Sequence, residues 1–278
     1  MSTTPPTSSA WGELPEPPPP LPPPPPGDAP ASAAGPKGLP AVGWSIWEAV
    51  LIGLVTNLVV AQTVVGVIAF LALGVTTSDD PKTIYVGLIV DLAWFGGMIG
   101  WLMLRHPRWR EQLGVHLDRE GLRNGGYGFV AGLILYPVIA FVVGLPLTIL
   151  FSALSGEDAT TPDQLPPHLT GAAVVASVIL AVLIAPVVEE TYFRGILFRS
   201  VRDVRGPGVG IAVSAALFGL VHYAPAEGAG ELVLPLVMVL TGAVLAVLYE
   251  RSGNLVVPIA AHMAFNAIGV TLILSGWG

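Results

Sequence analysis

Residues 171–199, GAAVVASVILAVLIAPVVEETYFRGILFR, decide the fold of this chain. The stretch begins with a long uncharged, mainly apolar segment. Glu189 and Glu190 follow this segment, and Arg194 comes four residues after Glu190. The stretch exceeds the ~20 residues that a helix needs to cross about 30 Å of hydrocarbon. Because ionisable groups are costly inside a membrane, they are functional candidates by default. The stretch therefore predicts a transmembrane helix that carries a functional site.

The composition of the whole chain agrees with a membrane protein. Of 278 residues, 53% are hydrophobic and only 11% are charged, against about a quarter charged in ordinary soluble domains. The mean hydropathy is +0.72. There is no cysteine, so disulfides and thiolate chemistry are excluded. These values exclude a soluble enzyme, a nucleic-acid binder and a disulfide-stapled secreted domain.

Outward from this stretch, apolar blocks alternate with short polar segments. They predict an all-α polytopic transmembrane bundle of about seven spans, with a bundle domain at 44–278 and a catalytic core at 171–275. The expected spans are 46–75, 83–104, 126–154, 171–199, 208–223, 231–249 and 255–274. The fifth is short, and we expect it to be buried among its neighbours.

Residues 1–43 form a separate region. The first 40 residues hold 15 of the 27 prolines, including Pro17–Pro20 and Pro22–Pro26. Such runs form neither helix nor sheet and favour an extended, solvated backbone. We interpret the region as a disordered Pro-rich cytoplasmic tail, and the alternative is a ligand for an SH3-like or WW-like partner.

The orientation follows from the positive charges of the short loops. The loops after the second and fourth spans are rich in arginine, whereas the loop after the third contains Glu157, Asp158 and Asp163 without a positive charge. This predicts a cytoplasmic N-terminus. Ten arginines and two lysines suggest a GC-rich genome and a bacterial plasma membrane. The arginines of the two loops are Arg105, Arg108, Arg110, Arg119, Arg123, Arg199, Arg202 and Arg205.

Three late spans place polar residues at a similar depth. Counted from the cytoplasmic side at about 1.5 Å per residue, Glu190 lies about 20 Å deep, His222 about 22 Å, and His262 and Asn266 roughly 16 and 22 Å. His262 and Asn266 share a helix face because they are four residues apart. Neighbouring Glu189 and Glu190 point about 100° apart.

One of the two glutamates can therefore face a reaction centre while Arg194, four residues after Glu190, neutralises the other. We expect Glu189 at the centre and Glu190 on Arg194. The alternative is that Glu190 and Arg194 form a buried ion pair that only fixes helix packing. For Asp91 in the second span, we expect a hydrogen bond that supports helix packing, and the alternative is a role in support of the site.

The motifs Glu189-Glu190-x-x-x-Arg194, Phe218-x-x-x-His222 and His262-x-x-x-Asn266 resemble those of the CPBP (Abi) intramembrane proteases. This family includes the type II CAAX prenyl endopeptidases. The resemblance covers about residues 171–274. The first three spans and the tail carry no signature of the family.

The resemblance implies a role for each motif residue. Glu189 and His222 would activate a water, His262 and Asn266 would stabilise the oxyanion, and Glu190 with Arg194 would support the site. Such members are described as glutamic or metalloproteases. We favour hydrolysis without a cofactor; if a divalent metal such as zinc is used, its ligands would be Glu189, His222 and His262.

The implied function is an intramembrane endopeptidase hydrolase that cleaves a membrane-associated peptide or protein within the lipid bilayer. CAAX-type processing and bacteriocin maturation or self-immunity are both compatible with the sequence, and no nucleic acid is expected as a partner. The alternative is a non-catalytic scaffold or immunity protein, or a proton-coupled transporter. We expect the site residues to converge on a cavity that opens toward the cytoplasmic side.

Overall fold

The computed structural model describes Met1 and residues 38–77, 79–156, 158–159, 165–166, 169–223 and 229–276. Contacts divide the chain into two units, Met1–Ala31 and Ser32–Gly278. All helices of the described residues belong to the second unit, and these residues form no strand, which confirms the all-α class. The predicted proline runs and the loop residues Glu157 and Asp163 lie outside the described residues.

The helical elements follow one another with short connections. Elements η3 to η6 are π-helical segments inside longer helices, and η7 is a 3-10 turn. In chain order the elements are α1 (Ile46–Gly53), η3 (Leu54–Gly66), α2 (Val67–Leu73), α3 (Thr83–Arg105), α4 (Trp109–Leu113), α5 (Arg119–Ile139), η4 (Ala140–Gly144), α6 (Leu145–Ser155), α7 (Ala172–Val178), η5 (Ile179–Ile184), α8 (Ala185–Glu190), η6 (Thr191–Phe198), α9 (Arg199–Arg205), α10 (Pro207–Val221), η7 (Ala229–Leu232), α11 (Val233–Ser252) and α12 (Val256–Leu274).

All seven predicted apolar segments are helical. Within the described residues, six continuous helices are long and apolar enough to cross a membrane, and the shorter apolar helix is α10. The predicted fifth span is therefore short, as expected. The six long helices are Ile46–Leu73, Thr83–Arg105, Arg119–Ser155, Ala172–Arg205, Gly230–Ser252 and Val256–Leu274.

Local signals in the sequence explain where helices begin and end. Ser45 and Glu48 form a capping box at the start of α1, and the Asp118 side chain accepts the Gly121 N–H at the start of α5. These bonds satisfy amide groups that have no partner inside a helix. Gly253 ends α11 with φ +61°, a left-handed conformation that glycine adopts without steric cost.

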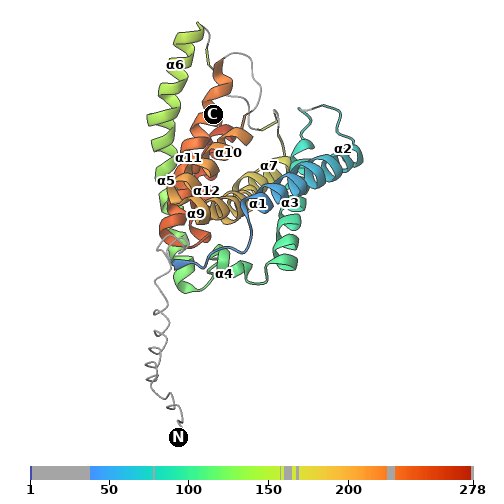
Figure 1. Cartoon of the computed structure of the whole chain (residues 1–278). Helices are drawn as coiled ribbons and strands as arrows, with labels where there is room; N and C mark the ends of the chain where they lie inside the picture. Colours follow the sequence, from blue (N-terminus) through green and yellow to red (C-terminus); the bar gives the residue numbers. More distant parts are fainter. Residues whose placement is uncertain are drawn as a thin grey trace. The chain divides into compact units, whose positions relative to one another are not determined.

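The Ala172–Arg205 helix, which carries Glu189, Glu190 and Arg194, occupies a central position. In Figure 1, α7 lies between the N-terminal helices α1 to α3 and the group formed by α5, α11 and α12. The contacts agree, since α3 touches α7, η5 and α8 while α12 touches η5 and α8. The second span and the last span therefore face the segment with Glu189, Glu190 and Arg194 from two sides.

Helix α12 approaches α5 closely through glycine. A Cβ on Gly128 would collide with the backbone of Val257, and one on Gly132 would collide with the carbonyl of Ala261. Small residues allow such backbone contact between membrane helices. Because Ala261 precedes His262, this contact also determines where His262 lies.

The arginine-rich loops meet at one end of the bundle. The Leu255 N–H donates to the Gly114 carbonyl at 3.0 Å, Asn254 donates to the Gly121 carbonyl at 3.2 Å, and Arg199 donates to the Gln112 carbonyl. These bonds join the loops before α5 and α12 to helix α9. We call this side the arginine-rich end; it holds Arg105, Arg108, Arg110, Arg119, Arg123, Arg199, Arg202, Arg205 and Arg251.

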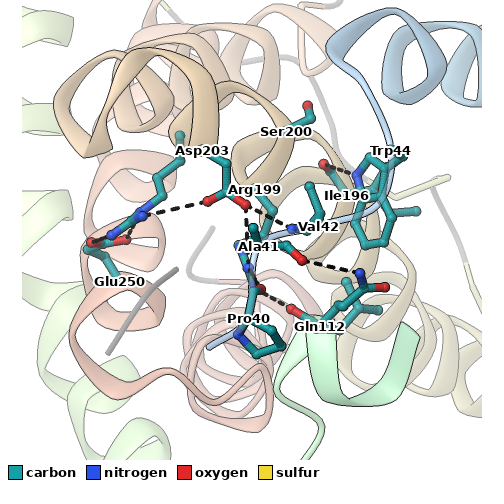
Figure 2. A network of polar contacts seen from close by, with 12 residues as sticks. Pro40, Ala41, Val42, Trp44, Gln112, Ile196, Arg199, Ser200, Asp203 and Glu250 are labelled. Carbon is teal, nitrogen blue, oxygen red and sulfur yellow. Dashed lines mark hydrogen bonds and ion pairs between the residues drawn. The ribbon is translucent and has the colours of Figure 1, made fainter. Parts of the chain in front are cut away.

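Residues 39–44 run across this end and bind to η6 and α9 (Figure 2). The Val42 N–H donates to Asp203 at 2.9 Å, buried Arg199 donates to the Pro40 carbonyl, and the Trp44 indole donates to the Ile196 carbonyl at 3.1 Å. Contacts with the bundle thus begin at residue 39, earlier than the boundary at 43 that the composition indicated. We call residues 39–44 the strap.

Candidate active site

The pair formed by Glu190 and Arg194 lies at the centre of the site. Their side chains are both 0% exposed, and Arg194 Nη1 lies 2.7 Å from Glu190 Oε1. Arg194 Nη2 donates to the Gly242 carbonyl at 2.8 Å, and the guanidinium stacks on Phe218 at 4.4 Å. Two buried charges need this kind of close partner and additional hydrogen bonds. The predicted contact between the two residues is therefore present.

His262 is held by the same carboxylate. Its Nδ1 lies 3.0 Å from Glu190 Oε1, and its Nε2 lies 3.9 Å from Glu189 Oε2. The imidazole is thus placed between the two neighbouring glutamates. Because Glu190 is paired with Arg194, it is an acceptor, so Nδ1 carries the proton and Nε2 points toward Glu189.

His222 ends helix α10 and has one ring nitrogen fixed. Its Nδ1 lies 2.7 Å from the Phe218 carbonyl, which can only accept a hydrogen bond. Nδ1 therefore carries the proton, and the neutral ring presents Nε2 as an acceptor. Phe218 is fully buried and its ring packs against both His222 and His262, with centroids 4.7 and 5.7 Å apart.

Asn266 lies one turn after His262 on α12. Its Nδ2 donates to the Ala181 carbonyl at 2.8 Å. This bond fixes the side-chain amide and leaves its second N–H free for another acceptor. The carbonyl that it uses belongs to η5, two turns before the glutamates.

One cavity of about 560 Å³ brings these residues together. Glu189, His222, His262 and Asn266 all line it, whereas Glu190 and Arg194 do not. The volume falls within the range of about 300–1,000 Å³ typical of ligand pockets. The remaining walls are mainly apolar, among them Leu180, Val237, Phe265 and Val270.

The direction of the cavity differs from our expectation. Glu189 is the last lining residue of its helix and Ser177 the first, while on α12 the lining begins at His262 and continues to Ile273. Both series lead away from the arginine-rich end. The predicted opening toward that end is therefore wrong.

Two further polar residues line the cavity, of which the sequence analysis had marked Asp91, and one backbone carbonyl supports the site. Asp91 and Tyr136 line the cavity, and no hydrogen bond involves Asp91 in the described part of the chain, so the packing bond expected for it is not present. The Gly242 carbonyl binds Arg194. Only Asp91 had a signal, as an ionisable residue within a span; nothing in the sequence marks Tyr136 or Gly242.

The geometry does not favour the metal site considered above. Among the described residues, no group of three histidine, aspartate or glutamate side chains is arranged to hold a metal ion. Glu189, His222 and His262 share a cavity without forming such a group.

Two comparisons with known proteins relate the chain to membrane peptidases. Residues 171–268 match the family model described as type II CAAX prenyl endopeptidase Rce1-like. The chain is also 25% identical over 164 residues to the "Putative membrane peptidase YdiL" of Bacillus subtilis (strain 168). That match covers 57% of this chain and 64% of the relative. No solved structure gives a significant match.

The matched residues contain all three motifs whose side chains meet at the cavity and behind it. The match to the family model falls on this part of the chain. Over these residues the chain is similar to the type II CAAX prenyl endopeptidases, which are part of the CPBP family of membrane proteases.

Proposed function

We propose that the protein is an intramembrane endopeptidase that hydrolyses a peptide bond through a water activated by Glu189 and His222. The observation that carries the proposal is the convergence of Glu189, His222, His262 and Asn266 on one cavity. They come from three separate helices and share a space large enough for a peptide segment. The family match supports proteolysis as the general activity.

In the first step, Glu189 acts as the general base. Its carboxylate accepts a proton from a water that also donates to Nε2 of His222, and the water oxygen forms a bond to the scissile carbonyl carbon. The fixed tautomer of His222 suits this role, because its hydrogen bond to Phe218 leaves Nε2 as the acceptor. The carbonyl oxygen becomes an oxyanion.

His262 and Asn266 stabilise this oxyanion. Asn266 offers its free N–H, and His262 offers Nε2–H when the ring is protonated on both nitrogens. The positive charge of that ring is balanced by the Glu189 carboxylate before the proton transfer and by the oxyanion after it, while Glu190 accepts from Nδ1 on the other side of the ring. When the C–N bond breaks, the proton held by Glu189 passes to the leaving amine, which gives a new carboxylate and a new amine terminus.

Glu190 and Arg194 act as positioning residues. Neither lines the cavity, and Glu190 Oε1 holds both Arg194 and His262. Arg194 in turn packs on Phe218, whose ring contacts both histidines. The pair therefore fixes the orientation of the imidazoles.

A proton-coupled transporter is the competing reading. A proton relay would place its titratable groups in sequence along a path across the bilayer. The four cavity residues instead lie at the base of one cavity, with apolar walls beyond them. This arrangement supports hydrolysis rather than transport.

The proposal includes the location of the protein. The excess of arginine at one end supports a plasma membrane of a bacterium with the N-terminus in the cytoplasm. The substrate is a membrane-associated peptide or protein, and CAAX-type processing or bacteriocin maturation are the candidate reactions. A partner of the Pro-rich tail is a further proposal, and the proline runs that would bind it lie outside the described residues.

The test is a search for new peptide termini in membranes. Cells that express the wild-type chain are compared with cells that express Glu189→Gln, and the termini of membrane and secreted peptides are identified by mass spectrometry. Purified protein in liposomes is then given the peptide so identified, alongside prenylated and unprenylated CAAX peptides. Termini that depend on Glu189 support the proposal. Identical termini in both strains, with no cleavage of any peptide in liposomes, would reject it.

A further inference from the structure

The cavity extends from the site residues in one direction only. From Glu189 back to Ser177 its lining covers about 18 Å of helix, and from His262 on to Ile273 about 16 Å, at 1.5 Å per residue. On α3 the lining runs from Asp91 back to Ile84. All three series end where their helices reach the side opposite the arginine-rich end. Leu165, in the segment before α7, and Leu234, in the first turn of α11, border the cavity on that side.

The way toward the arginine-rich end is closed in the described residues. Glu190, Arg194 and Phe218 are 0% exposed directly behind the site. Phe198 and Tyr249, also 0% exposed, pack against each other in the next layer, with ring centroids 5.9 Å apart.

Beyond that layer, charged side chains bind one another across the helix ends. Arg202 pairs with Glu250 at 2.9 Å, and Arg199 lies 3.7 Å from Asp203, which also accepts the Val42 N–H of the strap (Figure 2). A peptide could reach Glu189 from this end only if these layers separated.

The charges indicate which end faces the cytoplasm. Nine of the ten arginines lie at the closed end, and the tenth, Arg194, is buried in the site. At the opposite end the described residues hold Lys82 as the single basic side chain, together with Asp79, Asp80 and Glu231. Short loops with an excess of arginine and lysine lie on the cytoplasmic side of the membrane. The closed end is therefore the cytoplasmic one.

We infer that substrate enters the cavity from the extracytoplasmic side. This inference rests on the proposed function and narrows its substrate: an apolar segment of an exported or membrane-inserted peptide, cleaved after it has crossed or entered the bilayer. The apolar walls suit such a segment, and the charged residues stay at the base of the cavity. A C-terminal tail presented from the cytoplasm does not fit this route.

Because the chain has no cysteine, single cysteines report access without background. Leu234→Cys and Leu165→Cys place a thiol at the border of the cavity, and Leu117→Cys, at a position that is 68% exposed near the arginine-rich end, is the matched control. The reagent is a membrane-impermeant maleimide, applied to right-side-out spheroplasts and to inside-out vesicles. Two border positions are used so that the test can still be read if one of the two variants misfolds.

We expect both border cysteines to react in spheroplasts and the control to react in inside-out vesicles. Labelling of the border cysteines from the vesicle side only, from neither side while the control reacts, or labelling of the control in spheroplasts would overturn the inference. The same labelling is repeated in Glu189→Gln. The pattern of labelling does not depend on catalysis, so a protein that shows the expected access but no cleavage would refute the proposed function and leave the route intact.

Discussion

The Nδ1 atom of His262 lies 3.0 Å from the Oε1 atom of Glu190, although the two residues are 72 positions apart. This contact joins the last helix of the bundle to the helix that carries the two glutamates. Glu190 Oε1 also holds Arg194 at 2.7 Å, so one buried oxygen fixes a cation and an imidazole. The Glu190–Arg194 pair is therefore part of the support of the site as well as of the fold.

Replacement of Glu190 by Gln should reduce stability first. It leaves Arg194 as a buried charge without its counter-ion, and breaking one side of a buried pair costs about 3–5 kcal/mol. We expect a clearly lower thermal midpoint in detergent. The double variant Glu190→Gln/Arg194→Met should recover part of this loss without recovering cleavage, since His262 stays without its carboxylate. If Glu190→Gln is as stable as wild type, another group must neutralise the charge of Arg194.

Replacement of Gly132 by Ala should damage the site from a distance. The new Cβ would collide with the carbonyl of Ala261, forcing α5 and α12 apart and displacing His262. Gly126→Ala is the matched control on the same helix, because nothing lies within 4 Å of its Cβ. We expect a lower thermal midpoint and a reduced kcat for Gly132→Ala only. The control should match or slightly exceed wild-type stability, since alanine favours helix by about 1 kcal/mol.

Asn266→Ala should slow the reaction without abolishing it. Removal of one oxyanion donor typically lowers kcat by about 10²–10³-fold, and KM should change little because the amide acts on the transition state. The side chain also donates to the Ala181 carbonyl, so the thermal midpoint should fall by a few degrees at most. The measurement is kcat and KM in liposomes. Unchanged kcat would remove Asn266 from the mechanism.

Two truncations should separate the tail from the strap. Deletion of residues 2–37 should leave stability unchanged, because the described contacts with the bundle begin at residue 39. Deletion of residues 2–44 removes the Trp44 indole that donates to the Ile196 carbonyl and the Pro40 carbonyl that accepts from buried Arg199. Loss of a buried tryptophan alone typically costs about 3–5 kcal/mol. Equal thermal midpoints of the two truncated proteins would show that the strap contributes nothing.

The sequence was sufficient for the fold class and for the convergence of the site. The lengths of the apolar blocks predict the membrane spans directly. Counting residues along the helices places Glu189, His222, His262 and Asn266 at comparable depths without any knowledge of packing. The pairing of Glu190 with Arg194 follows from their separation of four residues on one helix. These are local properties, so a single sequence reveals them.

Contacts that depend on the relative rotation and approach of helices were not predictable. The bond between Glu190 and His262 requires α12 to face α8 closely, and that approach depends on Gly132 meeting Ala261. The direction of the cavity depends on how apolar side chains such as Leu180 and Val237 leave space, and their hydrophobicity gives no sign of it. Residues 39–43 of the strap were assigned to the tail because Pro40 continues a proline-rich composition, whereas their contacts with α9 are tertiary.

The central claim is that Glu189 activates the water that cleaves the peptide bond. Its most direct test is the cleavage rate of Glu189→Gln in liposomes, measured on the peptide identified by its new termini, with and without a strong chelator. Glu111→Gln is the control, since that glutamate is 63% exposed in a surface pair with Arg108, which contributes little to stability. We predict no cleavage by Glu189→Gln at a wild-type thermal midpoint, a wild-type rate for Glu111→Gln, and no effect of the chelator on either active protein. Cleavage by Glu189→Gln at the wild-type rate would contradict the account.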